Sequence, residues 1–246
     1  LHTATLVHDD IIDNSDLRRG KTTVNVAWSN SHGVLIGDFI YSKAFMLMNE
    51  IGNFKVIDEL SSATNKIAEG ELMQLANKNN LNTSLQQLKK ISYYKTGRLF
   101  EASAKSAAML SGKSIPFIEN ISKAARLIGI AFQVRDDLLD YGVSKGNIGK
   151  PEMQDILEYK ITYPLYFALK NSSKKDSSKI LKKLKNKDFS IEEVADFVSS
   201  SNAFNKCNSL IQNYSNEISK CINQISNKEI RDEMLNLSEI LKNRYE

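Results

Sequence analysis

The stretch from Ile115 to Tyr141, IPFIENISKAARLIGIAFQVRDDLLDY, decides the fold class of this chain. It is far longer than a typical strand, and its single proline, Pro116, suits the first turn of a helix. We therefore predict one long helix here. Its last turns carry two adjacent aspartates and a third three residues on, Asp136-Asp137-x-x-Asp140.

Further helical segments extend to both sides of this stretch. Apolar residues at helical spacing and capping patterns at Ser84 and Ser190 mark them. We predict helices over residues 1–13, 34–49, 54–75, 84–110 and 161–170, one that begins after Ser190, and one that contains the apolar stripe from Leu210 to Ile225. The strongly apolar segment 34–49 is predicted to be buried. No strand or short repeat stands out, so the predicted fold is all-α, a single-domain bundle of long helices.

Composition excludes several classes of protein. The 246 residues include 3 prolines and 11 glycines, and 41% of them are hydrophobic, which favours a folded helical domain over disorder. No run of 18 apolar residues is present, so we expect no transmembrane segment. The net charge is +4, and lysines crowd residues 170–187 without interleaved aromatics. We interpret that segment as a solvated helix or loop and expect no nucleic-acid partner.

The two cysteines, Cys207 and Cys221, are best explained as free thiols. If they share one helix, they lie roughly 21 Å apart, too far for a disulfide. Free thiols are typical of a reducing compartment, so we predict a cytoplasmic location.

Two aspartate motifs carry the chemical signal. Positions i and i+4 of a helix share a face, so Asp9 lies beside Asp13, and Asp136 lies beside Asp140 with Gln133 one turn earlier. Each motif follows an apolar helical turn, where repelling carboxylates are costly without a cation. Carboxylate oxygens suit Mg²⁺, and a cleft between two such motifs would bind Mg²⁺ and, through it, a diphosphate.

Basic residues near the ends of the same helices fit an anionic substrate. Arginine grips phosphate with a planar fork, and lysine acts as a point charge. The candidates are Arg18, Arg19, Lys95, Lys150 and Lys160, with Thr96 beside Lys95.

The order of these motifs resembles that of the trans-polyprenyl diphosphate synthases. The run HTATLVHDDIID, from His2 to Asp13, and the following Leu17-Arg18-Arg19-Gly20 look like the first Asp-rich motif of that family. Later segments follow the family's order: Gly37-Asp38, Glu69-Gly70-Glu71 with Gln74, Lys95-Thr96-Gly97-x-Leu99-Phe100 and Phe132-Gln133-x-x-Asp136-Asp137-x-x-Asp140. The resemblance runs from Leu1 to roughly Ala168, and its details are most like the octaprenyl type.

The resemblance implies the fold of the isoprenoid synthases, a helical bundle around a central cavity. Residues 1–246 would form one polyprenyl synthase domain, with that domain's N-terminal helices upstream of Leu1. It also implies Mg²⁺ as cofactor, a homodimer, and head-to-tail addition of isopentenyl diphosphate to an allylic diphosphate (farnesyl or geranyl diphosphate). A long, about octaprenyl, product for a quinone side chain is the expected outcome.

The resemblance also implies roles for individual residues. Mg²⁺ would be held by Asp9, Asp13 and Asp136, supported by Asp10, Asp137 and Asp140. The allylic diphosphate would be held by Arg18, Lys95, Lys150 and Lys160, and isopentenyl diphosphate would face Arg19 and His2. The carbocation site would be lined by Thr96 and Gln133. Ala4, five residues before Asp9, would lie at the mouth of the product tunnel, where a small side chain favours a long product; helix packing is the alternative role.

The sequence departs from the family pattern at two places. In the loop that follows the second Asp motif, Gly149-Lys150 precedes Pro151, Asp155 is kept, and Tyr159 stands where the family has a glycine before Lys160. The family's upstream Gly-Lys-Arg segment, which helps to bind isopentenyl diphosphate, has no counterpart from Leu1 onward.

Three other functions compete with a synthase. A terpene cyclase has a second metal motif with Ser or Thr and Glu, which Asp136–Asp140 does not match. A phosphohydrolase built on His8-Asp9 needs further histidines, and the only others are His2 and His32. A non-catalytic subunit of a heteromeric synthase stays open because of the altered loop, although both Asp motifs are intact.

Overall fold

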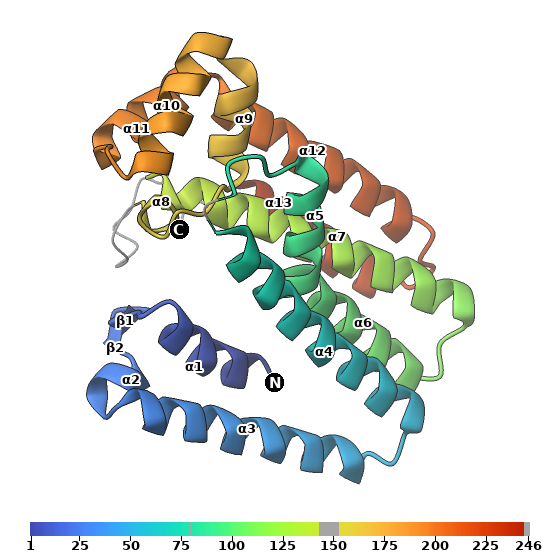
Figure 1. The fold of residues 1–246 in the computed structure, drawn as a ribbon. Coiled ribbons are helices and arrows are strands. Elements are labelled where there is room, and N and C mark those ends of the chain that lie inside the picture. The colour runs from blue at the N-terminus through green and yellow to red at the C-terminus, as the bar shows by residue number, and fades with distance from the viewer. Residues whose placement is uncertain (79, 143–152, 244–246) are drawn as a thin grey trace.

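The computed structural model describes residues 1–78, 80–142 and 153–243 of the chain. Its elements are the helices α1 (His2–Ile12), α2 (Val24–Ala27), α3 (Asn30–Glu50), α4 (Phe54–Asn77), α5 (Leu85–Ser92), α6 (Arg98–Leu110), α7 (Ile115–Asp140), α8 (Gln154–Leu157), α9 (Tyr163–Asn171), α10 (Lys174–Asn186), α11 (Ile191–Ser200), α12 (Ala203–Ile222) and α13 (Lys228–Asn243), the π-helix η1 (Tyr93–Gly97), and the strands β1 (Leu17–Arg18) and β2 (Lys21–Thr22). The predicted all-α fold is confirmed (Figure 1).

Helix α7 is the central element of the bundle. It lies between α6 and α12, and more than half of its residues are buried. It begins as predicted, with Pro116 in its first turn. Gly129 allows a close approach, because a Cβ there would lie 2.6 Å from the Cα of Gly97. A helix buried on most sides holds its end rigidly, and the second Asp motif is at that end.

The predicted helix from Ser84 to Leu110 forms with one interruption. Ser84 and Gln87 make a reciprocal capping box at the start of α5. Residues Tyr93–Gly97 then widen into the π-helix η1 before α6 continues to Leu110. Single π turns are rare and concentrate at functional sites. This one contains Lys95 and Thr96.

The prediction that segment 34–49 is buried is wrong. Helix α3 lies at the lower edge of Figure 1, packed on one side by α1 and α2, and its other side faces outward. Leu35, Phe39 and Met46 are 67%, 70% and 57% exposed. An apolar run indicates a surface that favours removal from water, but it does not say which partner covers that surface.

The smallest elements were not predicted. No strand was expected, yet β1 and β2 form a two-residue antiparallel ribbon, and α2 follows it. Strands this short leave no alternating pattern to detect. Cys207 and Cys221 are free and buried on one helix, α12, as expected. Within the described part of the chain, no helix is both long and apolar enough to cross a membrane.

Candidate active site

Three segments lie around the first Asp motif. They are the last turn of α1, the π-helix η1 with Lys95, and residues 158–160 after α8. The ammonium of Lys160 lies 3.3 Å from Oδ1 of Asp13, which ties the last of these segments to the first. Predicted site residues distant in sequence are therefore brought together.

The three aspartates of the first motif differ in their surroundings. Burial raises the pKa of Asp9 to about 6, against an opposing effect of Lys95. Burial also works to raise the pKa of Asp13, but Lys160 and Lys95 outweigh it and hold that pKa below its usual value. Asp9 is therefore the carboxyl in this motif that most needs a further cation.

Asp10 is buried and has a different partner. Its Oδ1 accepts from Nε of Arg18 at 2.7 Å and lies 2.7 Å from Nη2 of the same guanidinium. A charge-assisted contact with two nitrogens orients the arginine. In this structure Asp10 thus holds Arg18, one of the residues predicted to hold the allylic diphosphate.

Arg19 and His2 lie near each other, and both are exposed. Arg19 is exposed at the ribbon turn, with φ +52°, and is followed by Gly20 at φ +74°. Partial burial and the nearby positive charge of Arg19 lower the pKa of His2. A neutral His2 can donate or accept a hydrogen bond, and Arg19 keeps its charge toward solvent.

Lys95, on η1, contacts acidic and amide side chains of α4. Its Nζ lies 2.6 Å from Oε1 of Glu71 and 2.8 Å from Oε1 of Gln74, both on α4. Burial works to lower the pKa of Lys95, but the carboxylates of Glu71 and Asp9 outweigh it and raise that pKa. Glu71 belongs to the site although it was not assigned a role; its place in the Glu69-Gly70-Glu71 motif was the available signal.

A chain of hydrogen bonds joins η1 to the second Asp motif. The hydroxyl of Thr96 donates to Gln133 Oε1 at 2.8 Å, and Gln133 Nε2 donates to Asp137 Oδ1 at 2.9 Å. The backbone N–H of Tyr163 donates to Asp137 Oδ2 at 3.2 Å. Burial raises the pKa of Asp137 to about 7 despite these donors. Because Asp137 uses both oxygens, it orients Gln133 and Thr96.

The other two aspartates of the second motif lie at the same helix end. Asp140 accepts from the backbone N–H groups of Gln154 at 3.0 Å and Asp155 at 3.1 Å, which anchors the start of α8. Asp136 is half-buried one turn before Asp140. Burial and the carboxylates of Asp140 and Asp137 raise the pKa of Asp155 well above its usual value. Asp155 is a further acid of the site.

Lys160 is buried between two acids, with Nζ 2.6 Å from Glu158 and 3.3 Å from Asp13. Burial works to lower its pKa, but Asp13 and Asp155 outweigh it and raise it. Tyr159, which replaces the family's glycine, has φ +57° and packs its ring edge-on against Phe189. Predicted Lys150 lies outside the described residues.

Ala4 and His8 are four residues apart and share a face of α1, and Asp9 points about 100° away from His8. Ala4 is fully buried, and the His8 ring occupies the space where a Cβ of Gly37 on α3 would stand. His8 Nε2 is 3.4 Å from Oδ1 of Asp38. The burial of Ala4 fits helix packing and a place at the product tunnel alike. His8 faces Asp38 on α3 whereas Asp9 faces Lys95, which argues against a phosphohydrolase pair.

The donor set fits a metal that is shared with a substrate. Within the described residues, no three acidic, histidine or cysteine side chains converge into a complete metal cage. Mg²⁺ commonly takes one or two carboxylates, several waters and phosphate oxygens. The half-buried carboxyls of Asp9, Asp13 and Asp136 suit that mode.

A model of the polyprenyl synthetase family matches residues 1–201. The chain belongs to the polyprenyl synthetase family. It is 42% identical over 180 residues to the octaprenyl diphosphate synthase of Escherichia coli, which covers 73% of this chain and 56% of that protein. It is 34% identical over 247 residues to the geranyl-diphosphate-specific all-trans-nonaprenyl-diphosphate synthase of Rhodobacter capsulatus, which covers 100% of this chain and 76% of the relative. The chain thus spans little more than half the length of its octaprenyl relative.

Solved structures of the family have the same fold. A decaprenyl diphosphate synthase from Rhodobacter capsulatus superposes with a TM-score of 0.91 at 29% identity, covering 100% of this chain and 76% of that one. A polyprenyl synthase from Caulobacter crescentus, in complex with calcium and isoprenyl diphosphate, gives a TM-score of 0.93 at 30% identity with the same coverage. The isoprenoid synthase type of helical fold expected from the sequence is therefore confirmed.

Proposed function

We propose that the protein is a trans-polyprenyl diphosphate synthase, a prenyltransferase that adds isopentenyl diphosphate units to an allylic diphosphate. The observation that carries the proposal is the meeting of Asp9 and Asp13 with Lys95 and Lys160 at the end of α1. Alternating acids and cations in a partly buried site suit a magnesium diphosphate, whose own charges alternate in the same way.

In the proposed reaction, Lys95, Lys160, Arg18 and Lys150 bind the allylic diphosphate, and Arg19 and His2 face isopentenyl diphosphate. Mg²⁺ held by Asp9, Asp13 and Asp136 would supply positive charge to the departing diphosphate. Asp10, Asp137 and Asp140 support this set by orienting Arg18, Gln133 and α8.

The allylic C–O bond then ionises, and the double bond of isopentenyl diphosphate attacks the cation. A proton leaves to the released diphosphate, so no covalent enzyme intermediate is needed. The aligned oxygens of Thr96 and Gln133 are dipoles fixed beside the cation, and fixed dipoles need no reorganisation during the reaction.

The product is proposed to be long, about octaprenyl, and to serve as a quinone side chain. Support comes from the names of relatives, which include octaprenyl and nonaprenyl synthases and a probable hexaprenyl synthase. We propose that the enzyme works in the cytoplasm as a homodimer. The outward apolar face of α3, with Leu35, Phe39 and Met46, offers a surface that a second copy would cover.

The deciding experiment incubates the full-length protein with Mg²⁺, isopentenyl diphosphate and either farnesyl or geranyl diphosphate, and measures product mass. We expect a series of linear polyprenyl diphosphates that ends near eight isoprene units, and none when EDTA replaces Mg²⁺. Cyclic hydrocarbons would identify a terpene cyclase, and free prenyl alcohols alone would identify a hydrolase. Elongation only after addition of a second, different subunit would assign the protein to the non-catalytic class.

A further inference from the structure

A buried charged network surrounds the π-helix that carries Lys95 and Thr96. Tyr93 is the first residue of η1, and its hydroxyl donates to Oε2 of Glu101 at 2.6 Å. Arg98 directly follows η1, and its Nη1 donates to Oε1 of Glu59 on α4 at 2.5 Å. The two ends of the five-residue π turn are thus held by separate contacts.

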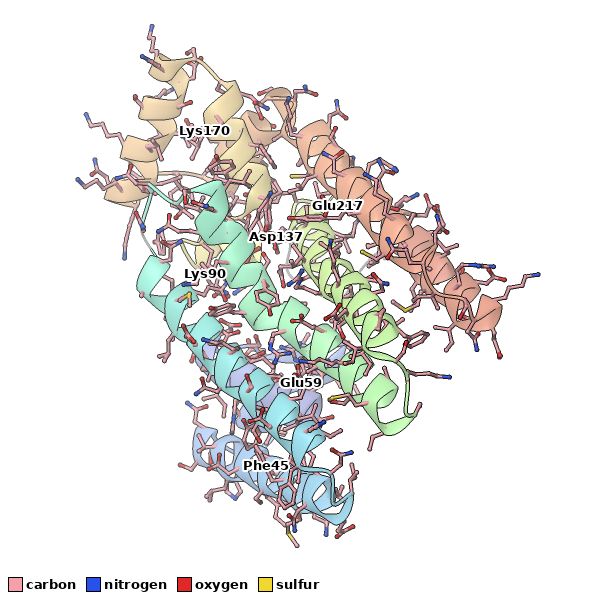
Figure 2. All side chains as sticks on the ribbon, turned by 90° about the vertical axis from the view of Figure 1, so that its right-hand side faces the viewer. Phe45, Glu59, Lys90, Asp137, Lys170 and Glu217 are labelled. Carbon is pink, nitrogen blue, oxygen red and sulfur yellow. The ribbon has the colours of Figure 1, made fainter. Side chains whose placement is uncertain are left out.

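The central pair of this network, Glu59 and Arg98, is buried, and both carboxylate oxygens of Glu59 accept hydrogen bonds. Glu59 and Arg98 are 7% and 8% exposed. The second oxygen of Glu59 accepts from Lys105 at 2.5 Å, and Arg126 lies 3.9 Å from Glu101. Glu59 is labelled in Figure 2, well separated along the bundle from Asp137 of the second Asp motif. Among the described residues, the hydrogen bonds of this network are separate from those that Lys95 and Thr96 make.

Two glycines allow neighbouring backbones to pack closely at the π turn. A Cβ at Gly70 on α4 would lie 2.8 Å from the backbone nitrogen of Lys95. A Cβ at Gly97 would lie 3.1 Å from the carbonyl oxygen of Arg126 on α7. The π turn is thus packed between two helices, with little space to adopt another path.

A π turn holds one residue more than an α turn, and relaxing it to α geometry rotates the residues beyond it by about 100°. If η1 relaxed while α6 stayed in place, Lys95 would turn away from Glu71 and Asp9. Thr96 would likewise lose Gln133. The direction of both side chains depends on the π turn being maintained.

We propose that Glu59, Arg98, Tyr93 and Glu101 are positioning residues: they lock η1 in its π form, so that Lys95 and Thr96 point into the site. This inference rests on the proposed prenyl transfer and extends it to residues behind the site. Lys105 supplies the matched control, because it pairs with the same Glu59 but lies eight residues beyond the end of η1.

The test compares Tyr93→Phe and Arg98→Gln with Lys105→Gln, and with Arg98→Lys, which keeps the charge, in the full-length protein. For the first two we expect kcat of prenyl transfer to fall roughly tenfold to a hundredfold, as misalignment by about an ångström does. KM for isopentenyl diphosphate should stay within about twofold, because neither Lys95 nor Thr96 faces that substrate. Lys105→Gln should lower Tm by an amount similar to Tyr93→Phe, because each variant removes one partly exposed contact, while its kcat changes less than about twofold. Arg98→Lys should recover part of the lost kcat.

Amide hydrogen exchange of residues 93–97, measured without substrate, tests the lock on η1 independently of the proposed prenyl transfer. Faster exchange in Tyr93→Phe and Arg98→Gln, and not in Lys105→Gln, supports the lock even if the wild-type protein shows no prenyl transfer. Unchanged exchange in Tyr93→Phe would overturn the lock. So would kcat values that simply follow the loss of Tm across all four variants.

Discussion

The ammonium of Lys160 lies 3.3 Å from the carboxylate of Asp13, although 147 positions separate them in the sequence. The contact joins the first Asp motif to the segment that follows the second. Lys160 also lies 2.6 Å from Glu158, and its side chain is only 9% exposed. It is therefore a buried cation shared by two acids.

Replacing Lys160 by Gln should destabilise the protein and weaken substrate binding. Removing one partner from a buried ion pair leaves uncompensated charge, which costs roughly 3 kcal/mol. Urea unfolding measures this loss, and KM for the allylic diphosphate should rise. Lys78→Gln is the control, because Lys78 pairs with Glu158 at 3.4 Å from another side and has no contact with Asp13 among the described residues. Equal effects of both variants would show that the Asp13 contact has no special role.

The affinity for Mg²⁺ should depend steeply on pH. Burial raises the pKa of Asp9 to about 6 and of Asp137 to about 7, whereas both would titrate near 3.8 when unfolded. The folded state therefore keeps protons that the unfolded state loses. That contribution to stability is fully present below about pH 4 and is lost as pH rises through 6 to 7.

Of these two carboxyls, only Asp9 is a proposed Mg²⁺ ligand. Mg²⁺ must displace its proton, so it should bind about tenfold more weakly at pH 5 than at pH 8. Thermal unfolding at both pH values, with and without Mg²⁺, measures the difference. Asp9→Asn should lose most of the stabilisation at pH 8. An equal Mg²⁺-induced shift at pH 5 and pH 8 would contradict the assignment of Asp9 to the metal site.

Local patterns in the sequence predicted most of the fold. The capping box at Ser84 and Pro116 in the first turn of α7 are local signals, and the structure contains both. The π turn was not predictable, since Tyr93–Gly97 continues the same helical pattern as its neighbours. The exposed face of α3 was not predictable either, because periodicity reports hydrophobic character and not the partner that covers it.

The sequence predicts candidate site residues one by one, but it does not contain the contacts between them. The first Asp motif presents Asp9 and Asp10 as equivalent neighbours, whereas a 100° turn separates them in space. Asp10 forms an ion pair with Arg18, whereas Asp9 interacts with the positive charge of Lys95. Such pairings depend on how distant helices pack, which spacing along one helix does not contain.

Ala4→Phe should destabilise the junction of α1 and α3. Ala4 is fully buried, and overpacking a buried site typically costs about 1–3 kcal/mol. Denaturant unfolding measures the cost, and product mass measures any change of chain length. We expect lower stability and a shorter product, because a bulky side chain at the predicted tunnel mouth would stop elongation earlier. Unchanged product length would leave Ala4 with the packing role alone.

Asp10→Asn should separate the role of Asp10 from that of Asp9. Because Asp10 contacts Arg18 through two nitrogens, its neutral variant loses the charge that orients the guanidinium. KM for the allylic diphosphate should rise roughly tenfold, while the apparent affinity for Mg²⁺ changes less than about twofold. In Asp9→Asn the Mg²⁺ affinity should fall strongly. If both variants lose Mg²⁺ affinity to the same extent, Asp10 is a metal ligand and its contact with Arg18 must open when substrate binds.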